Sequence, residues 1–275
     1  MTGVDFLSDM IALRTRRIAA DYGDLSPADR ERLACCAPPP VEFAAALRDR
    51  LDVAVIAEVK KASPSAGPIA PECEASKQAL HYQDGGAAAI SVLTEPESFG
   101  GSFTDLSDVA DAVDVPVLCK DFVIDPVQLF VARGHGADAV LLMVSVLGDQ
   151  IAEYIDLAST LGLAALVEVV DEHELETALA ASANLIGVNS RNLRTLEVDT
   201  YSAHTVIRAA ADAGATVVAA SGVRVRGDVE RAALAGAHAV LVGETLMRAQ
   251  FPEDILEDLT GVSRMSAAFA DASGS

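Results

Sequence analysis

The chain has 275 residues, of which 51% are hydrophobic, and it carries a formal net charge of −21 at pH 7. This length suits one large α/β domain, and the hydrophobic content is far above that of a disordered chain. The negative charge argues against nucleic acid or an anionic membrane surface as a partner. We find no apolar run of membrane-crossing length and no signal-peptide pattern, so we expect a cytoplasmic protein.

The four cysteines do not form a pattern typical of a disulfide or metal site. Cys35 and Cys36 are adjacent, so they do not easily pair with each other or make a Cys-x-x-Cys motif. Cys119 lies in an apolar run, where a small buried hydrophobe is expected. We predict no metal, no cofactor and no cysteine nucleophile.

Three helices are predicted ahead of the first strand. Residues 4–20 place apolar side chains at helical spacing, and Ser26-Pro27 is typical of an N-cap followed by proline at the first helical position. That second helix runs to about Cys36, and residues 41–50 give a third. We interpret residues 1–50 as a helical extension.

Eight strand-like segments follow, separated by helical patterns. They cover about 53–60, 88–93, 116–120, 138–144, 163–169, 185–189, 216–221 and 238–242. A recurring junction, in which glycine closes a helix just before a strand, occurs at Gly86, Gly136 and Gly236. The alternation predicts an α/β protein with a (β/α)8 TIM barrel, formed as one domain over residues 1–275. An open doubly wound sheet is the alternative, although no G-x-G-x-x-G or Walker loop supports it.

The first strand ends in a pair of opposite charges. Glu58 and Lys60 are two residues apart, so on a strand they point to the same face as Ile56. Burying both ions is costly unless they are paired. The simple interpretation is an ion pair that caps the strand. Charges at strand ends of α/β folds often mark active sites, and we favour this second interpretation.

The segment that follows, residues 61–71, is rich in proline, and we predict a long loop there.

Polar side chains also follow the other strands. The carboxyl ends of barrel strands meet at one rim, where active sites lie. The candidate catalytic residues at this rim are Glu58, Lys60, Lys120, Glu168 and Asn189. Each one alone would be explained as a solvated strand end. Together they supply a general acid, a general base and electrostatic clamps without a metal.

The last two strands end in glycine-containing turns, Ser221-Gly222 and Gly243-Glu244. Glycine exposes backbone N–H groups, and barrels of this type often bind phosphate there. Lys60 and Arg191 would add positive charge. Tight turns explain each end alone but not both, so we predict a phosphorylated small molecule as the substrate.

Five segments resemble the indole-3-glycerol-phosphate synthase family. They are Ala57-Glu-Val-Lys-Lys-Ala-Ser-Pro-Ser65, Leu118-Cys-Lys-Asp-Phe122, Val167-Glu-Val169, Gly187-Val-Asn-Ser-Arg-Asn-Leu193 and Val242-Gly-Glu-Thr-Leu-Met247. The resemblance covers nearly the whole chain, including the N-terminal helices. It implies a lyase of tryptophan biosynthesis that closes the indole ring of 1-(2-carboxyphenylamino)-1-deoxyribulose 5-phosphate, with loss of CO2 and water.

The resemblance also implies roles for individual residues. Lys120 would be the general acid in ring closure, and Glu168 the acid or base for dehydration. Glu58 and Asn189 would orient these groups and the ribulose hydroxyls, and Lys60 would contact the substrate carboxylate or phosphate. The implied binding set is Ser63, Ser221, Gly222 and Gly243 for substrate and phosphate, and Phe99, Phe122 and Leu141 for the anthranilate ring.

One position departs from the family pattern. The family usually has Glu-Ser-Gly at the end of the seventh strand, where this chain has Ala220-Ser221-Gly222. The missing carboxylate implies a slower enzyme, a shifted substrate or a redirected paralogue. A second alternative is a phosphoribosylanthranilate isomerase, although that family has a cysteine where this chain has Glu58. We expect a monomer, with a dimer as the alternative.

Overall fold

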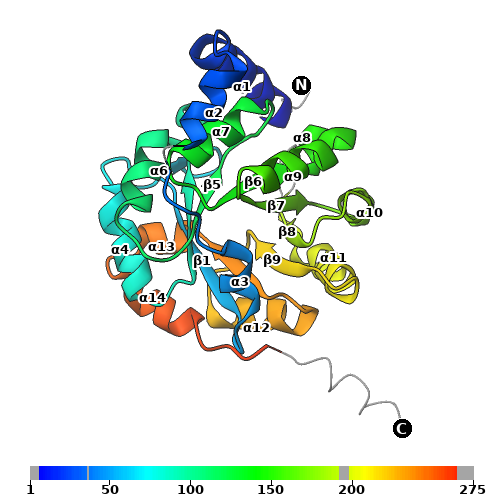
Figure 1. The fold of residues 1–275 in the computed structure, drawn as a ribbon. Helices are drawn as coiled ribbons and strands as arrows, with labels where there is room; N and C mark the ends of the chain where they lie inside the picture. The colour runs from blue at the N-terminus through cyan, green and yellow to red at the C-terminus, as the bar shows by residue number, and fades with distance from the viewer. Residues whose placement is uncertain (1–5, 36, 192–197, 265–275) are drawn as a thin grey trace, which may run out of the picture.

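The computed structural model describes residues 6–35, 37–191 and 198–264, and its centre is a closed barrel of parallel strands (Figure 1). The barrel strands are β1 (Ala54–Val59), β4 (Ala89–Leu93), β5 (Val117–Lys120), β6 (Ala139–Met143), β7 (Ala164–Val169), β8 (Leu185–Asn189), β9 (Thr216–Ala220) and β10 (Ala239–Val242). They lie around the barrel in chain order, and β1 closes it by pairing with both β4 and β10. The predicted TIM barrel is confirmed, and the open-sheet alternative is wrong.

Helices surround the barrel and connect its strands (Figure 1). The longer connecting helices are α4 (Ala75–Asp84), α6 (Phe103–Ala110), α7 (Val127–Gly134), α9 (Ile151–Thr160), α10 (Glu172–Ala180), α11 (Thr200–Asp212), α12 (Arg226–Ala235) and α14 (Pro252–Leu259). Shorter helical turns are α5 (Pro96–Phe99), α8 (Val144–Leu147), η1 (Gly148–Gln150) and α13 (Glu244–Arg248). All of these short turns lie on the side of the barrel where the strands end.

The two faces of β1 are both buried. Val55, Ala57 and Val59 belong to the core between strands and helices. Ala54 and Ile56 belong to a second core inside the barrel. The period of two therefore directs Glu58 and Lys60 inward, above Ile56.

The recurring glycine junctions have a common physical reason. Gly136 and Gly236 adopt left-handed backbone angles, with φ of 85° and 102°. A Cβ atom at these positions would lie 2.7 Å from Ala110 Cβ and 2.9 Å from Ala211 Cβ. Only glycine fits both the conformation and the close approach of the neighbouring helix.

Three helices precede the barrel, in agreement with the prediction: α1 (Phe6–Tyr22), α2 (Pro27–Cys35) and α3 (Phe43–Arg48). The predicted start of α2 is confirmed, because Ser26 Oγ accepts the Asp29 amide and the Asp29 carboxylate accepts the Ser26 amide. Phe43 and Leu47 of α3 are buried in the core inside the barrel.

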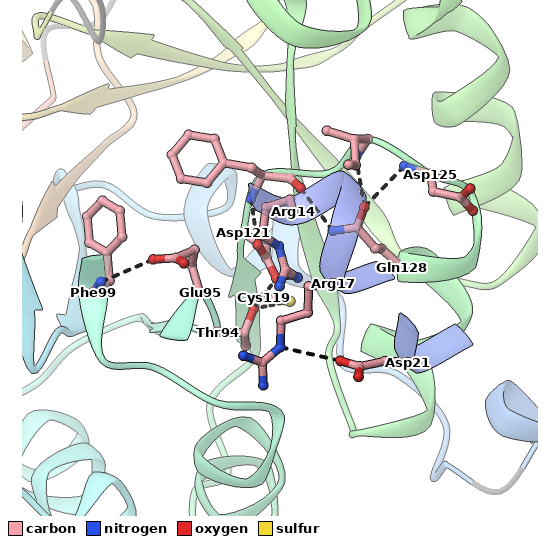
Figure 2. Close-up of polar contacts among 12 residues, drawn as sticks. Arg14, Arg17, Asp21, Thr94, Glu95, Phe99, Cys119, Asp121, Asp125 and Gln128 are labelled. Carbon is pink, nitrogen blue, oxygen red and sulfur yellow. Dashed lines mark hydrogen bonds and ion pairs between the residues drawn. The ribbon is translucent and has the colours of Figure 1, made fainter. Parts of the chain in front are cut away.

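Helix α1 is anchored at the other end of the barrel from α3, next to β5, the strand that carries Lys120. Arg14 of α1 forms a 2.6 Å ion pair with Asp121, and both side chains are almost fully buried (Figure 2). The Asp121 carboxylate also accepts from Thr94 Oγ1 at 2.8 Å and from the Phe122 amide at 2.7 Å. Breaking a buried pair leaves an uncompensated charge, so this contact fixes the extension against the rim.

Residues 61–71 are not wholly a loop, which corrects the prediction. They contain a small antiparallel hairpin, β2 (Ala62–Ser63) and β3 (Gly67–Pro68), which pairs Ser63 with Gly67. Gly67 adopts a φ of 65°, and this conformation allows the chain to reverse direction between β2 and β3. The proline-rich sequence did not indicate this hairpin.

The longest helix in the described ranges is α1, with 17 residues. Within those ranges, none of the helices combines the length and the apolar character needed to span a bilayer.

Candidate active site

A cavity of about 690 Å³ opens where the barrel strands end. This volume lies within the usual range for small-molecule sites. The cavity is lined by every residue that the sequence placed in the site: Glu58, Lys60, Ser63, Phe99, Lys120, Phe122, Leu141, Glu168, Asn189, Arg191, Ser221, Gly222, Gly243 and Glu244. Residues from strands far apart in the chain thus meet at one mouth.

Glu58 lies between two lysines. Its Oε1 is 3.1 Å from Lys60 Nζ, and its Oε2 is 3.5 Å from Lys120 Nζ. The Glu58 residue is only 3% exposed. Burial acts to raise the pKa of Glu58, but the two ammonium groups more than offset this and hold the pKa below its usual value. Glu58 is therefore an ionised carboxylate at neutral pH.

The Lys120 ammonium lies near both the Glu58 and the Glu168 carboxylates. Burial acts to lower the pKa of Lys120, but the nearby Glu58 and Glu168 charges reverse the direction and raise it. Burial raises the pKa of Glu168, and the Lys120 charge offsets only part of that rise. The site thus holds a protonated amine next to a carboxyl group that is prepared to carry a proton.

Asn189 is fixed by hydrogen bonds on both sides of its amide. Its Nδ2 donates to Glu168 Oε1 at 3.1 Å, and its Oδ1 accepts from Ser221 Oγ at 2.8 Å. The Oδ1 atom also accepts the Arg191 amide at 3.0 Å. This chain links the ends of β7, β8 and β9 and sets the orientation of the Glu168 carboxylate.

The turn after β9 lines the cavity with Ser221 and Gly222. Ser221 and Gly222 have consecutive positive φ angles of 66° and 79°. A Cβ atom at Gly222 would lie 3.0 Å from Thr200 Cγ2, so the turn requires glycine. Consecutive N–H groups in such a turn are a typical anion-binding arrangement. Glu244 lies beside this turn and pairs with Arg248 at 3.0 Å.

Gly243 has a second reason to be glycine, which the sequence did not reveal. A Cβ atom there would lie 2.5 Å from Glu58 Oε1 and 3.2 Å from Glu58 Cδ. The bare backbone at the end of β10 therefore makes room for the Glu58 carboxylate on the neighbouring strand β1.

The opposite side of the cavity is aromatic and apolar. The Phe99 and Phe122 rings lie 6.2 Å apart, and Leu141 of β6 lies in the same wall. Phe6 of α1 also lines the cavity and meets the Phe122 ring edge-on at 6.4 Å. Sequence reasoning missed Phe6, because its contact with residue 122 depends on how the extension folds back.

Other lining residues were also missed, and some had a signal in the sequence. Glu95 lies two residues after the end of β4, and Asp121 directly follows β5. Both are therefore near strand ends, as Glu58 and Glu168 are. Burial raises the pKa of Glu95 to about 7. Arg248 lies one helical turn beyond Glu244 and adds a cation to the cavity wall. A search for polar side chains that extended two residues beyond each predicted strand would have found the Glu95 and Asp121 carboxylates.

Ala220 lines the cavity at the end of β9, where it pairs in register with Asn189 and Leu241. Its methyl group is 7% exposed. Ala220 therefore lies beside Asn189, which holds Glu168.

Comparison with known proteins identifies the family. The family model described as indole-3-glycerol phosphate synthase matches residues 7–259. The chain belongs to the indole-3-glycerol phosphate synthase family. An indole-3-glycerol phosphate synthase of Mycobacterium avium is 46% identical over 243 residues, which cover 88% of this chain and 89% of the relative. That of Mycobacterium ulcerans is 48% identical over 227 residues, covering 82% of this chain and 83% of the relative.

More distant structures share the fold. A crystal structure of 3-hexulose-6-phosphate synthase has a TM-score of 0.62 at 16% identity, covering 75% of this chain and 98% of that one. A thiamine phosphate pyrophosphorylase from Pyrococcus furiosus has a TM-score of 0.57 at 17% identity, covering 78% and 95%. These likenesses concern the barrel alone. The synthase family match supports the synthase over the isomerase alternative.

Gly243→Ala should lower kcat of this synthase-family site by about 100-fold, the usual cost of losing one well-placed polar contact. The added methyl group would displace Glu58 from both lysines. Steady-state kinetics on the family substrate measures the loss, and thermal unfolding checks that the variant is folded.

Two further variants sharpen this test. Shortening the displaced side chain in Gly243→Ala/Glu58→Asp should recover part of kcat. Gly227→Ala is the matched control, because its nearest neighbour would be Arg231 Nη1 at 3.5 Å. Wild-type kcat in Gly243→Ala would show that the space beside Glu58 is unimportant.

Proposed function

We propose that this cavity closes the indole ring of 1-(2-carboxyphenylamino)-1-deoxyribulose 5-phosphate, with Lys120 as the general acid. The observation that carries the assignment is the placement of the partly buried Lys120 ammonium 3.5 Å from Glu58 Oε2 and close to Glu168, in a cavity that has an apolar wall and a glycine turn. An anionic, aromatic and phosphorylated substrate needs all of these features together.

In the proposed reaction, the ring carbon that bears the carboxylate attacks the ribulose ketone. Lys120 Nζ donates a proton to the ketone oxygen, which becomes a hydroxyl group. The raised pKa of Lys120 keeps its proton available at neutral pH. Departure of CO2 restores the aromatic ring. Glu168 then serves the dehydration as acid and base: it protonates the hydroxyl, which leaves as water, and it takes a proton from the adjacent methylene carbon as the indole double bond forms. Solvent returns a proton to Lys120.

The remaining residues would orient the substrate. Glu58 would orient the Lys120 ammonium, which lies 3.5 Å from its Oε2, and the ribulose hydroxyls, while Asn189 holds Glu168. Lys60 would contact the substrate carboxylate or phosphate. The phosphate would lie against Ser63, Arg191, Ser221, Gly222, Gly243 and Glu244, with Glu244 acting through its partner Arg248.

The aromatic ring would lie against Phe99, Phe122 and Leu141, which form the opposite wall. Aromatic walls favour offset or edge contacts with a planar ligand. Because β4, β5 and β6 carry this wall while β9 and β10 carry the glycine turns, the substrate would lie across the mouth.

We also propose that residues 1–275 act as one domain, that the protein is a cytoplasmic monomer, and that it needs neither metal nor cofactor.

Purified protein mixed with the substrate should show the appearance of indole absorbance and fluorescence. Lys120→Met should lower kcat by at least about 100-fold, as expected for loss of a general acid. Lys61→Met is the matched control, because Lys61 is the next residue after Lys60 but pairs with Asp105 at 2.7 Å. Absence of product from the wild-type protein would refute the proposal.

Ala220 supports a second candidate, a related enzyme redirected to another substrate. On the synthase proposal, Ala220→Glu should raise kcat/KM for the family substrate by about tenfold, or about 1.4 kcal/mol of transition-state stabilisation. Ala220→Gln adds the same bulk without charge and should not reproduce the gain. A loss in both variants would indicate a site rebuilt around a different molecule.

A further inference from the structure

Glu95 is a buried carboxylate in the cavity wall that the proposed reaction does not use. It lies two residues after the end of β4 and directly before the short helix α5. The Glu95 residue is 0% exposed. Such a group requires hydrogen-bond partners, because an unpaired buried carboxylate is very costly.

The partners of Glu95 are the backbone amides of the following turn. Its Oε1 accepts the Glu97 amide at 2.9 Å. Its Oε2 accepts the Ser98 amide at 2.8 Å and the Phe99 amide at 3.1 Å, and Figure 2 shows the contact with Phe99. One side chain thus satisfies three backbone donors at the start of a helical turn.

The same turn is closed from its other end. The Gly101 amide donates to the Glu95 carbonyl oxygen at 2.9 Å, and Gly100 adopts a left-handed φ of 65°. A Cβ atom at Gly101 would lie 2.0 Å from the Leu93 carbonyl oxygen. The segment from Glu95 to Gly101 is therefore a compact loop organised around one carboxylate.

This loop carries Phe99 into the cavity. The Phe99 ring packs against Phe122 at a centroid distance of 6.2 Å and an interplanar angle of 44°. We propose that Glu95 is a positioning residue that holds the Phe99 ring in the wall that receives the aromatic ring of the substrate. This inference rests on the proposed function, because it assumes an aromatic substrate.

A carboxylate suits this position better than an amide. Above its pKa of about 7 the ionised group accepts all three backbone hydrogen bonds through its two oxygens, and bonds to an ionised acceptor are stronger than neutral ones. Glutamine has the same shape, but its NH2 group would face backbone N–H donors. Aspartate keeps both acceptor oxygens, although its shorter side chain reaches less far.

Glu95→Gln should raise KM for the ribulose phosphate substrate about tenfold while kcat changes far less, since Lys120 and Glu168 are untouched. Glu95→Asp should restore part of the affinity. Asp108→Asn is the matched control, because Asp108 is an exposed carboxylate on the nearby helix α6 and does not line the cavity. It should leave KM unchanged. Should Glu95→Gln not fold, Glu95→Asp carries the comparison.

A double-mutant cycle tests whether Glu95 acts through Phe99. In a Phe99→Ala background, Glu95→Gln should have little further effect on KM, because the ring that it positions is gone. An unchanged KM in the single variant, an equal fall in kcat, or full additivity with Phe99→Ala would overturn the inference. Wild-type protein that makes no product would instead refute the proposed function.

Discussion

The site depends on a buried carboxylate shared by two ammonium groups. Glu58 contacts Lys60 from its own strand and Lys120 from β5, two strands away around the barrel. None of these charges is stable alone in a desolvated cavity, because the penalty per ion is several kcal/mol. Their mutual contacts make the cluster possible and also set its protonation. The bare backbone of Gly243 completes the arrangement by leaving space for the carboxylate.

Two structural devices support this cluster. The ion pair between Arg14 and Asp121 joins the N-terminal extension to the residue after Lys120, so α1 becomes part of the rim. Gln128 adds a second anchor, because it donates to the Phe122 carbonyl and accepts the Ile124 amide (Figure 2). The turn that follows the central lysine is therefore fixed at both ends, as electrostatic preorganisation requires.

Sequence periodicity was sufficient to place the barrel strands and the charges at their ends. It located Glu58 and Lys60 on the inner face because a strand has a side-chain period of two. It did not locate Phe6, whose ring meets a residue from a distant part of the chain. Nor did it reveal the role of Glu95, since three hydrogen bonds to one carboxylate appear only when the following turn forms. Gly243 was predicted for phosphate, but its contact with Glu58 requires β10 to pair with β1.

The most direct test is the pKa of Lys120, measured by NMR titration of protein carrying isotope-labelled lysine. The chain has only four lysines, Lys60, Lys61, Lys77 and Lys120, so single substitutions assign the signals. We predict that the pKa of Lys120 lies above that of a free lysine side chain and falls in Glu58→Gln, because the variant removes a nearby negative charge. A Lys120 pKa at or below the free value, or one unaffected by Glu58→Gln, would contradict the account.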